Sequence, residues 1–170
     1  CEVPAENLVG KENEGVAVVM SGLDLERALI SPICVGMAER ALEITIQYAK
    51  DRKQFGKPIA EFQMIQSKIA DMYVWVEAMK ALNFKVLAEA NDLEVGGGGR
   101  GMIHANTAAS IMYTANMLNR VLREGAQVHG GMGYMWESEI NRLYRGNKLL
   151  EIGAGTTEVR KMIISRELLK

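Results

Sequence analysis

Cysteine is scarce in this sequence, with only Cys1 and Cys34 among 170 residues. Two cysteines give no disulfide framework and no metal-ligand spacing. We expect one terminal thiol and one thiol packed within a helix, which is a common place for free cysteine. Such usage is typical of a reducing compartment and argues against a secreted protein.

Histidine is equally rare, since His104 and His129 are the only two. They have no helical spacing and no acidic or cysteine companion nearby in the sequence, so no metal site is predicted. The sequence also contains no Gly-x-Ser-x-Gly elbow, no P-loop and no Rossmann fingerprint. The corresponding hydrolase and nucleotide-binding classes are therefore disfavoured.

Neither sign of charge is in excess, because 20 Lys and Arg stand against 21 Asp and Glu. The basic residues are dispersed, which disfavours a nucleic-acid partner. No apolar run reaches the roughly 20 residues that a membrane-spanning helix needs. The first residues lack the basic and apolar regions of a signal peptide. They also lack an initiator Met, so we expect a processed chain or a part of a longer protein.

Apolar residues make up 48% of the chain, which suits one globular domain. Residues 1–10 are interpreted as a short strand and turn, and residues 14–20 as a short helix. Long helices are predicted over residues 23–50, 62–91 and 102–129, with Ile65, Ile69, Met72, Val76, Met79, Phe84 and Leu87 of the second facing the core. A turn is expected at residues 55–58, a flexible break at glycines 96–99 and a loop at 131–134. A shorter helix over 137–150 and a last helix capped by Thr156 or Thr157 complete an all-α, antiparallel (up-down), four-helix-bundle-like domain.

Glu26 is the first candidate for chemistry. On a helix its neighbours Ile30 and Ile33 are apolar. A carboxylate buried on such a stripe favours its protonated form, as a general base near neutral pH requires. The alternative is an exposed glutamate beside Asp24 and Arg27 at a helix start.

Three further segments place glycines, cations or free amides at helix ends. Residues 153–158 form a glycine-flanked turn into a helix N-terminus, which suits a phosphate or a polarised carbonyl. Residues 52–56 place cations and an aromatic ring at a helix exit, where Arg52 could form a fork on a pyrophosphate. Residues 127–131 end a helix where the backbone is open to a ligand. A threonine-capped loop, dipole compensation and a plain C-cap are the respective alternatives.

Five motifs follow one another along the chain: Leu23-Asp24-Leu25-Glu26-Arg27, Asp51-Arg52-Lys53-Gln54-Phe55-Gly56, Phe62-Gln63 with Lys68-Ile69-Ala70-Asp71-Met72, Gly130-Gly131-Met132-Gly133-Tyr134, and Glu151-Ile152-Gly153-Ala154-Gly155-Thr156. Their order resembles the C-terminal half of the acyl-CoA dehydrogenase family over essentially the whole chain. The resemblance implies that residues 1–12 are the end of the family's middle β-domain. Residues 13–170 would then be its C-terminal helical domain, which binds flavin and acyl-CoA.

The resemblance implies an FAD-dependent oxidoreductase that carries out α,β-dehydrogenation of an acyl-CoA thioester. In that family a carboxylate removes the α-proton, and the β-hydrogen leaves as hydride to the flavin. The electrons then pass to electron-transfer flavoprotein. The FAD would lie at a subunit interface of a homotetramer built as a dimer of dimers.

The position of the catalytic base separates the branches of the family. Many members carry it at the position of Ala154, which cannot take a proton. The isovaleryl-CoA and long-chain branches place a glutamate on the first long helix, where Glu26 stands. Within the family the chain therefore most resembles the isovaleryl-CoA dehydrogenases of leucine catabolism. This resemblance implies that Glu26 is the catalytic base. Gly153 and Ala154 would leave width for a branched acyl group.

The resemblance also implies the remaining site residues. The substrate would be bordered by Asp24, Leu25, Arg27, Ala154 and Gly155, with the Ala154 amide polarising the thioester carbonyl. The cofactor would contact Arg52, Phe55, Gln63, Gln127, Val128, His129, Gly130, Gly131, Thr156, Thr157 and Glu158.

The chain departs from the family patterns at three places. It has Arg145-Gly146-Asn147-Lys148 where Arg-Asp-Ala-Lys is frequent, Leu150 where the isovaleryl branch has tyrosine, and His129 where an apolar or aromatic residue is common. A long-chain acyl-CoA dehydrogenase, an acyl-CoA oxidase and a non-catalytic helical scaffold are thus the alternatives. Alone, the chain is expected to be inactive and to self-associate through apolar faces. The expected compartment is the mitochondrial matrix in a eukaryote or the cytoplasm in a bacterium.

Overall fold

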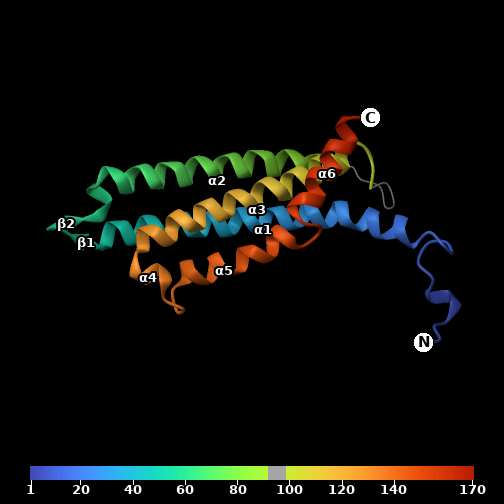
Figure 1. The fold of residues 1–170 in the computed structure, drawn as a ribbon, viewed down its shortest axis with the longest axis horizontal. Coiled ribbons are helices and arrows are strands. Elements are labelled where there is room, and N and C mark those ends of the chain that lie inside the picture. Colours follow the sequence, from blue (N-terminus) through green and yellow to red (C-terminus); the bar gives the residue numbers. More distant parts are fainter. Residues whose placement is uncertain (92–98) are drawn as a thin grey trace.

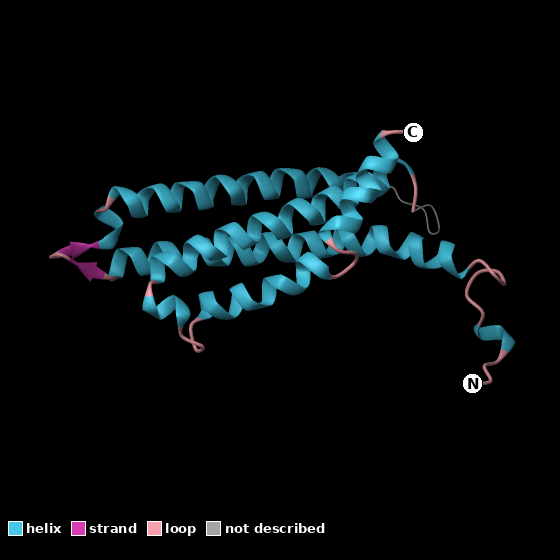
Figure 2. Ribbon diagram, viewed as in Figure 1, coloured by secondary structure: helices cyan, strands magenta, loops and turns pink. Residues whose placement is uncertain are grey.

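Helix α3 (Gly101–His129) is the central element of the fold. It packs against α1 (Gly15–Asp51), α2 (Gln63–Ala90), α5 (Glu139–Ile152) and α6 (Thr157–Leu168). The shorter elements are η1 (Ala5–Asn7), β1 (Lys53–Gln54), β2 (Lys57–Pro58), η2 (Ile59–Glu61) and α4 (Gly131–Tyr134). The computed structural model describes residues 1–91 and 99–170. Figures 1 and 2 show the long helices side by side, so the predicted all-α antiparallel bundle is confirmed.

The core lies between the long helices and α5. Its fully buried large side chains include Met72 and Met79 of α2, Ile111 and Leu118 of α3, and Ile140 of α5. On α1 small buried residues such as Ala38 and Ala41 let α3 approach closely. The buried positions of α2 recur at spacings of three and four, as expected for one face of a helix: Met72, Val76, Met79, Asn83, Val86 and Ala90. Phe84 lies off this face and is 67% exposed, so its predicted place in the core is wrong.

Helix α1 is longer than the sequence predicted. Residues 14–20 do not form a separate helix, because α1 already begins at Gly15 and continues through Pro32 to Asp51. Gly22 does not adopt the positive φ that ends many helices. The expected break therefore does not occur, and one uninterrupted helix connects the two ends of the bundle.

Residues 1–14 lie outside the bundle and are exposed. The strand predicted over residues 1–10 is wrong, since the segment contains only the short helix η1. A strand needs a partner for its backbone groups. In the described part of the chain the only strands are β1 and β2, which pair with each other.

Two glycine-containing segments differ in how well they were predicted. The predicted turn at residues 55–58 is a tight hairpin between β1 and β2, in which Phe55 (φ +52°) and Gly56 (φ +83°) both take left-handed conformations. The loop predicted over residues 131–134 is instead the short helix α4. It can pack on α3 because Gly133 has no side chain, and a Cβ there would lie 2.3 Å from the Ala126 carbonyl oxygen. Of the glycine break predicted at residues 96–99, residues 96–98 lie outside the described residues.

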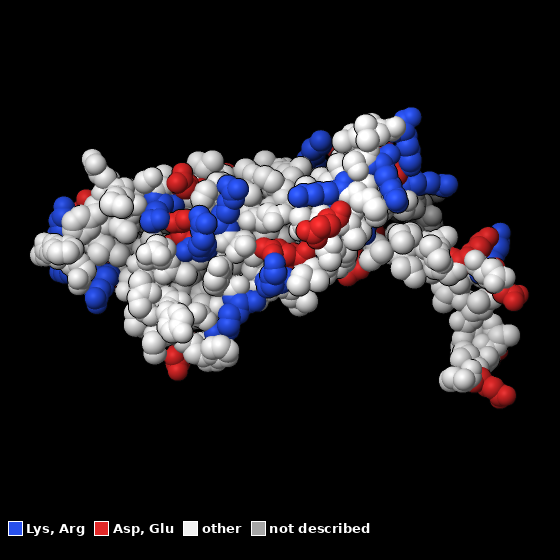
Figure 3. All heavy atoms as spheres, in the orientation of Figure 1, with Lys and Arg blue, Asp and Glu red and all other residues white. Residues whose placement is uncertain are grey.

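Acidic and basic side chains are interspersed on the face shown in Figure 3, in keeping with the balanced composition. No helix in residues 1–91 and 99–170 combines the length and hydropathy needed to cross a bilayer.

Cys1 is exposed and Cys34 is fully buried. Burial raises the pKa of the Cys34 thiol to about 11. Cys34 is thus the packed helical thiol that the sequence predicted.

Candidate functional site

The predicted site residues lie in two groups at opposite ends of α1. The first group surrounds Glu26 and the 153–155 bend (Gly153, Ala154 and Gly155), which joins α5 to α6. The second group surrounds Arg52, at the other end of α1. At 1.5 Å per residue the helical backbone between Glu26 and Arg52 is roughly 39 Å long. One copy of the chain therefore does not bring the two groups together.

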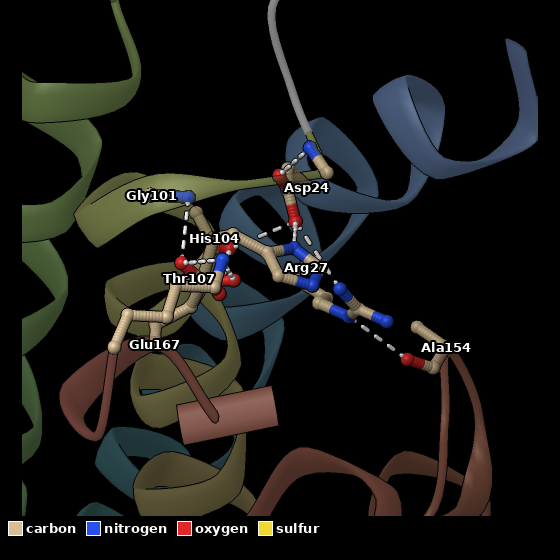
Figure 4. Close-up of polar contacts among 9 residues, drawn as sticks. Asp24, Arg27, Gly101, His104, Thr107, Ala154 and Glu167 are labelled. Carbon is tan, nitrogen blue, oxygen red and sulfur yellow. Dashed lines mark hydrogen bonds and ion pairs between the residues drawn. The ribbon is translucent and has the colours of Figure 1, made fainter. Parts of the chain in front are cut away.

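A buried polar network holds the first group (Figure 4). The Asp24 carboxylate is 0% exposed and accepts hydrogen bonds from Arg27 Nη1 at 3.1 Å, His104 Nδ1 at 2.6 Å and the Gly99 amide at 2.6 Å. Thr107 Oγ1 is also within reach, at 3.3 Å. These donors compensate a carboxylate that burial alone would destabilise. The network joins α1 to the start of α3.

The same network reaches the 153–155 bend. Arg27 is 2% exposed, and its Nε donates to the Ala154 carbonyl oxygen at 3.0 Å. Arg160, which is fully buried, donates from Nη2 to the carbonyl oxygens of Leu150 (3.0 Å) and Gly153 (2.5 Å). Two buried arginines thus hold the bend by its carbonyl groups.

This arrangement sets the direction of the bend's amides. No peptide bond in the described residues is cis, and in a trans peptide the C=O and N–H groups point in opposite directions. Since the Gly153 and Ala154 carbonyls face the buried arginines, the amides of Ala154 and Gly155 face away from them. The bend takes left-handed φ values of +57° at Ala154 and +97° at Gly155. Its two outward amides are suited to an oxygen that gains negative charge.

The bend leads into α6 through a capped N-terminus. Thr156 Oγ1 accepts from the Val159 amide at 3.4 Å, so Thr156 is the cap residue and Thr157 begins the helix. Glu158 lies in the first turn, and hydrogen bonds from its own backbone amide and from Thr156 lower the pKa of its carboxyl group. These residues are adjacent to Ala154 and far from Arg52, so the predicted cofactor residues do not form one cluster.

Glu26 lies on the outer side of α1. Its side chain is exposed, and Leu25, Leu29 and Ile33 near it are 50%, 57% and 53% exposed. The expected burial of Glu26 on a core stripe is therefore wrong for this chain. Arg27 is one residue after Glu26 and therefore about 100° around the helix from it. The core side of α1 is formed by Arg27 and the residues that follow it at helical spacing. Arg27 contacts the bend directly, so the part of α1 that carries Glu26 faces the 153–155 bend.

Burial also bears on the predicted substrate residues of α1. Asp24 and Arg27 have almost no exposed surface, and their polar side-chain atoms form hydrogen bonds within the network. In this chain they support the bend, and their place at the border of the substrate stays a prediction. Leu25 is half exposed beside Glu26. It remains free to contact a ligand.

The second group lines an open cavity of about 1240 Å³ at the far end of the bundle. It brings together most of the predicted cofactor residues, namely Arg52, Phe55, Gln63, Gln127, Val128, His129, Gly130 and Gly131. Arg52 is exposed and has no ion-pair partner within residues 1–91 and 99–170. An exposed guanidinium above an apolar cavity fits the phosphates and rings of a nucleotide cofactor.

His129 forms one wall of this cavity. Its ring stacks on Tyr48 with centroids 4.3 Å apart, and its Nδ1 lies 2.7 Å from the Gly125 carbonyl oxygen. A carbonyl only accepts, so Nδ1 carries a proton and donates it. Burial lowers the pKa of the imidazole. At neutral pH the ring is therefore uncharged, an aromatic wall like the apolar residues common at this position.

Several residues at both ends were not predicted as site residues. Lys57 and Phe62 line the cavity, with Lys57 Nζ 4.7 Å from the centre of the Phe62 ring. Lys57 lies in the turn predicted at residues 55–58 and Phe62 in the Phe62-Gln63 motif, so both could have been included on that ground. His104 and Arg160 gave no such signal, because their partners lie 80 and 7 to 10 positions away in the chain. Within residues 1–91 and 99–170 no three His, Cys, Asp or Glu side chains are grouped as metal ligands would be.

Comparison with known proteins agrees with this geometry. The family model for the "Acyl-CoA dehydrogenase, C-terminal domain" matches residues 13–169. The isovaleryl-CoA dehydrogenase of Oryza sativa subsp. japonica is 42% identical over 170 residues, which cover 100% of this chain and 40% of that protein. The caffeyl-CoA reductase-Etf complex subunit CarC of Acetobacterium woodii is 37% identical over 171 residues, covering 99% of this chain and 43% of that protein.

Solved structures share the fold. Butyryl-CoA dehydrogenase from Megasphaera elsdenii superposes with a TM-score of 0.89 at 34% identity, covering 99% of this chain and 42% of that one. An acyl-CoA dehydrogenase from Bacillus anthracis complexed with FAD gives 0.88 at 31% identity, covering 98% and 31%. The chain thus spans about 40% of the length of the curated relatives it matches. It belongs to the acyl-CoA dehydrogenase family of FAD-dependent enzymes and carries that family's C-terminal helical domain.

Proposed function

We propose that the protein containing this chain dehydrogenates a short branched acyl-CoA of the isovaleryl-CoA type. The observation that carries the proposal is a pairing of two positions: a glutamate at 26 and an alanine at 154. Arg27 Nε contacts the Ala154 carbonyl, so these positions belong to facing segments. Only one of them holds a side chain that can accept a proton.

Each residue near the bend has a distinct role in this proposal. Glu26 removes the proton from the α-carbon of the thioester. The outward amides of Ala154 and Gly155 stabilise negative charge on the thioester oxygen as the proton leaves. FAD, when bound, supplies the acceptor for the β-hydrogen. The small residues Gly153 and Ala154 leave room beside the reacting carbons for a branch in the acyl chain.

The exposure of Glu26 is compatible with this role in a longer protein. Leu25, Leu29 and Ile33 form an exposed apolar strip next to it. Exposed apolar strips of this kind are usually covered by another part of the protein or by a ligand. Covering this strip would also remove water from the Glu26 carboxylate, and a desolvated carboxylate is a stronger base.

The two separated groups support a cofactor shared between subunits. Arg52, Phe55, Gln63 and the 127–131 segment lie at one end of α1, roughly 39 Å of helix from Glu26. If both groups contact FAD, they contact it from different copies of the chain. We therefore include a homo-oligomer, a tetramer in the family pattern, in the proposal. The compartment follows the relatives in the proposal: mitochondrial matrix in a eukaryote and cytoplasm in a bacterium.

The test uses the full-length protein with isovaleryl-CoA, palmitoyl-CoA and electron-transfer flavoprotein. We expect faster turnover of isovaleryl-CoA and dependence on electron-transfer flavoprotein. Preference for palmitoyl-CoA would identify a long-chain enzyme, and rapid oxygen reduction without the partner would identify an oxidase. Full-length protein that binds no flavin would instead indicate a helical scaffold.

Glu26→Gln tests the base directly. The variant should lose turnover while the FAD absorbance spectrum stays unchanged, because the amide cannot accept the α-proton. Glu43→Gln is the matched control, since Glu43 is a 70% exposed glutamate on the same helix. Normal turnover by Glu26→Gln would remove Glu26 from the mechanism. Tight FAD binding by the 170-residue chain alone would contradict the shared cofactor site.

A further inference from the structure

We propose that His104 is a positioning residue for the 153–155 bend, acting through Asp24 and Arg27. The inference rests on the proposed function, because it concerns the bend that would hold the thioester. His104 lies on α3, and within the described residues its side chain forms no hydrogen bond with the bend itself; its hydrogen-bond partner is Asp24. Its influence is carried by three consecutive hydrogen bonds (Figure 4).

The first link joins His104 to Asp24. Nδ1 of His104 lies 2.6 Å from Oδ1 of Asp24, and both side chains are more than nine-tenths buried. The same Oδ1 accepts from Arg27 Nη1 at 3.1 Å. Ionised carboxylate oxygens only accept, so His104 Nδ1 donates. His104 thereby fixes the carboxylate plane from the side opposite α1.

The second link joins Asp24 to the bend. Arg27 uses Nη1 on Asp24 and Nε on the Ala154 carbonyl oxygen, at 3.1 and 3.0 Å. The guanidinium is planar and rigid, so turning one edge moves the other. A change in the Asp24 carboxylate therefore rotates the group that holds Ala154.

The third link is the peptide unit between Ala154 and Gly155, through which the Arg27 contact sets the direction of the Gly155 amide. The Ala154 carbonyl and the Gly155 amide belong to one rigid trans peptide. Arg160 holds the preceding peptide by the Gly153 carbonyl. Without Arg27 the second peptide unit would be held only at one end. His104 thus sets the direction in which the Gly155 amide meets the substrate oxygen.

α6 closes the same corner from the other side. Glu167 Oε2 accepts from the Gly101 amide at 2.9 Å, at the start of the helix that carries His104. Glu167 also pairs with Lys170, and the hydrogen bonds from Lys170 and from the Gly101 amide lower the pKa of the Glu167 carboxyl group. Glu167 thus ties α6 to the first turn of α3, three residues before His104.

The experiment compares His104→Leu with His104→Asn in the full-length holoenzyme. Leucine fills the space but donates nothing, whereas the asparagine amide places a donor near the position of Nδ1. Asn106→Leu is the control on α3, because Asn106 bonds to Glu89 of α2 and not to the network. The measurements are kcat and KM for isovaleryl-CoA, and hydrogen exchange of the backbone amides in residues 150–158.

For His104→Leu we expect kcat to fall about 10-fold with KM changed less than about 2-fold, since geometry and not binding is disturbed. Amide exchange in residues 150–158 should rise about 10-fold. His104→Asn and Asn106→Leu should resemble the wild type in both measurements. Recovery by asparagine would not occur if His104 served only to fill space.

Two results would overturn the proposal: wild-type exchange and kcat in His104→Leu, or equal impairment in His104→Leu and His104→Asn. Absence of wild-type turnover would instead refute the proposed function. In that case the exchange measurements would still decide whether His104 holds the bend.

Discussion

Replacing Asp24 with asparagine removes one negative charge from the centre of the buried network and changes almost no volume. Arg27, at 2% exposure, then loses its only carboxylate partner in the described residues. The asparagine side chain has one oxygen and one NH₂ group in place of two oxygens. At least one of the donors from His104, Gly99 and Arg27 is left facing another donor.

Removing one partner of a buried ion pair costs about 3–5 kcal/mol, because the other charge stays buried without compensation. We take about 3 kcal/mol for Asp24→Asn, since asparagine retains one acceptor. For a chain of this size each kcal/mol lowers the melting temperature by about 2–4 °C. The expected decrease is therefore about 6–12 °C.

The assay is thermal and urea unfolding of the 170-residue chain, followed by circular dichroism at 222 nm or an equivalent helical signal. The matched control is Glu139→Gln, the same acid-to-amide change in the pair of Glu139 with Arg40, whose side chains are 35% and 47% exposed. An exposed pair contributes little, so the control should melt close to the wild type. Equal destabilisation by the two substitutions would refute the assignment of Asp24 as a buried structural anion.

Two further predictions concern the cavity end of the bundle. Gly133→Ala should lower the free energy of unfolding by about 1–3 kcal/mol, because its Cβ would lie 2.3 Å from the Ala126 carbonyl oxygen; Gly131→Ala, which meets nothing within 4 Å, should be close to neutral in the same urea titration. Burial lowers the pKa of His129 below the ordinary histidine value of 6.5, so the unfolded chain takes up the proton first as pH falls. The stability from the neutral ring is therefore complete above pH 6.5 and is lost as pH falls through the folded-state pKa. His129→Phe should remove this part of the pH dependence, and an unchanged difference between wild type and variant at pH 7.5 and 5.5 would contradict it.

The helices and the residues of the cavity could be predicted from the sequence because both depend on local patterns. Periodic apolar residues gave α2, α3 and α5 to within a few positions. Arg52, Phe55 and the 127–131 segment come together because α1 and α3 run in the same direction in the up-down bundle, so their C-terminal ends lie at the same side. Residues at two adjacent helix ends of a bundle therefore line the same cavity.

The orientation of α1 was not accessible in the same way. Its sequence contains two apolar strips, one with Leu25, Leu29 and Ile33 and one that includes Ala28 and Ala38. Which strip faces the core depends on the helices packed against it. The sequence predicted that Ile30 and Ile33 share the core side with Glu26, whereas only Ile30 packs against the core and Ile33 is 53% exposed. Packing of the second strip against the core buries Asp24 and Arg27 and exposes Glu26. The contact of Asp24 with His104, 80 positions away, could not be inferred from spacing at all.

The unbroken helix from Gly15 to Asp51 has a consequence for insertions and deletions. One added residue between Arg27 and Tyr48 would turn Arg52 about 100° around the axis relative to Glu26 and move it about 1.5 Å along it. Seven added residues would nearly restore the angle but displace Arg52 by about 10 Å. The number of residues in this segment therefore fixes the distance and the angle between Glu26 and Arg52. A change in that number would alter the relation of the two groups as surely as a substitution at either end.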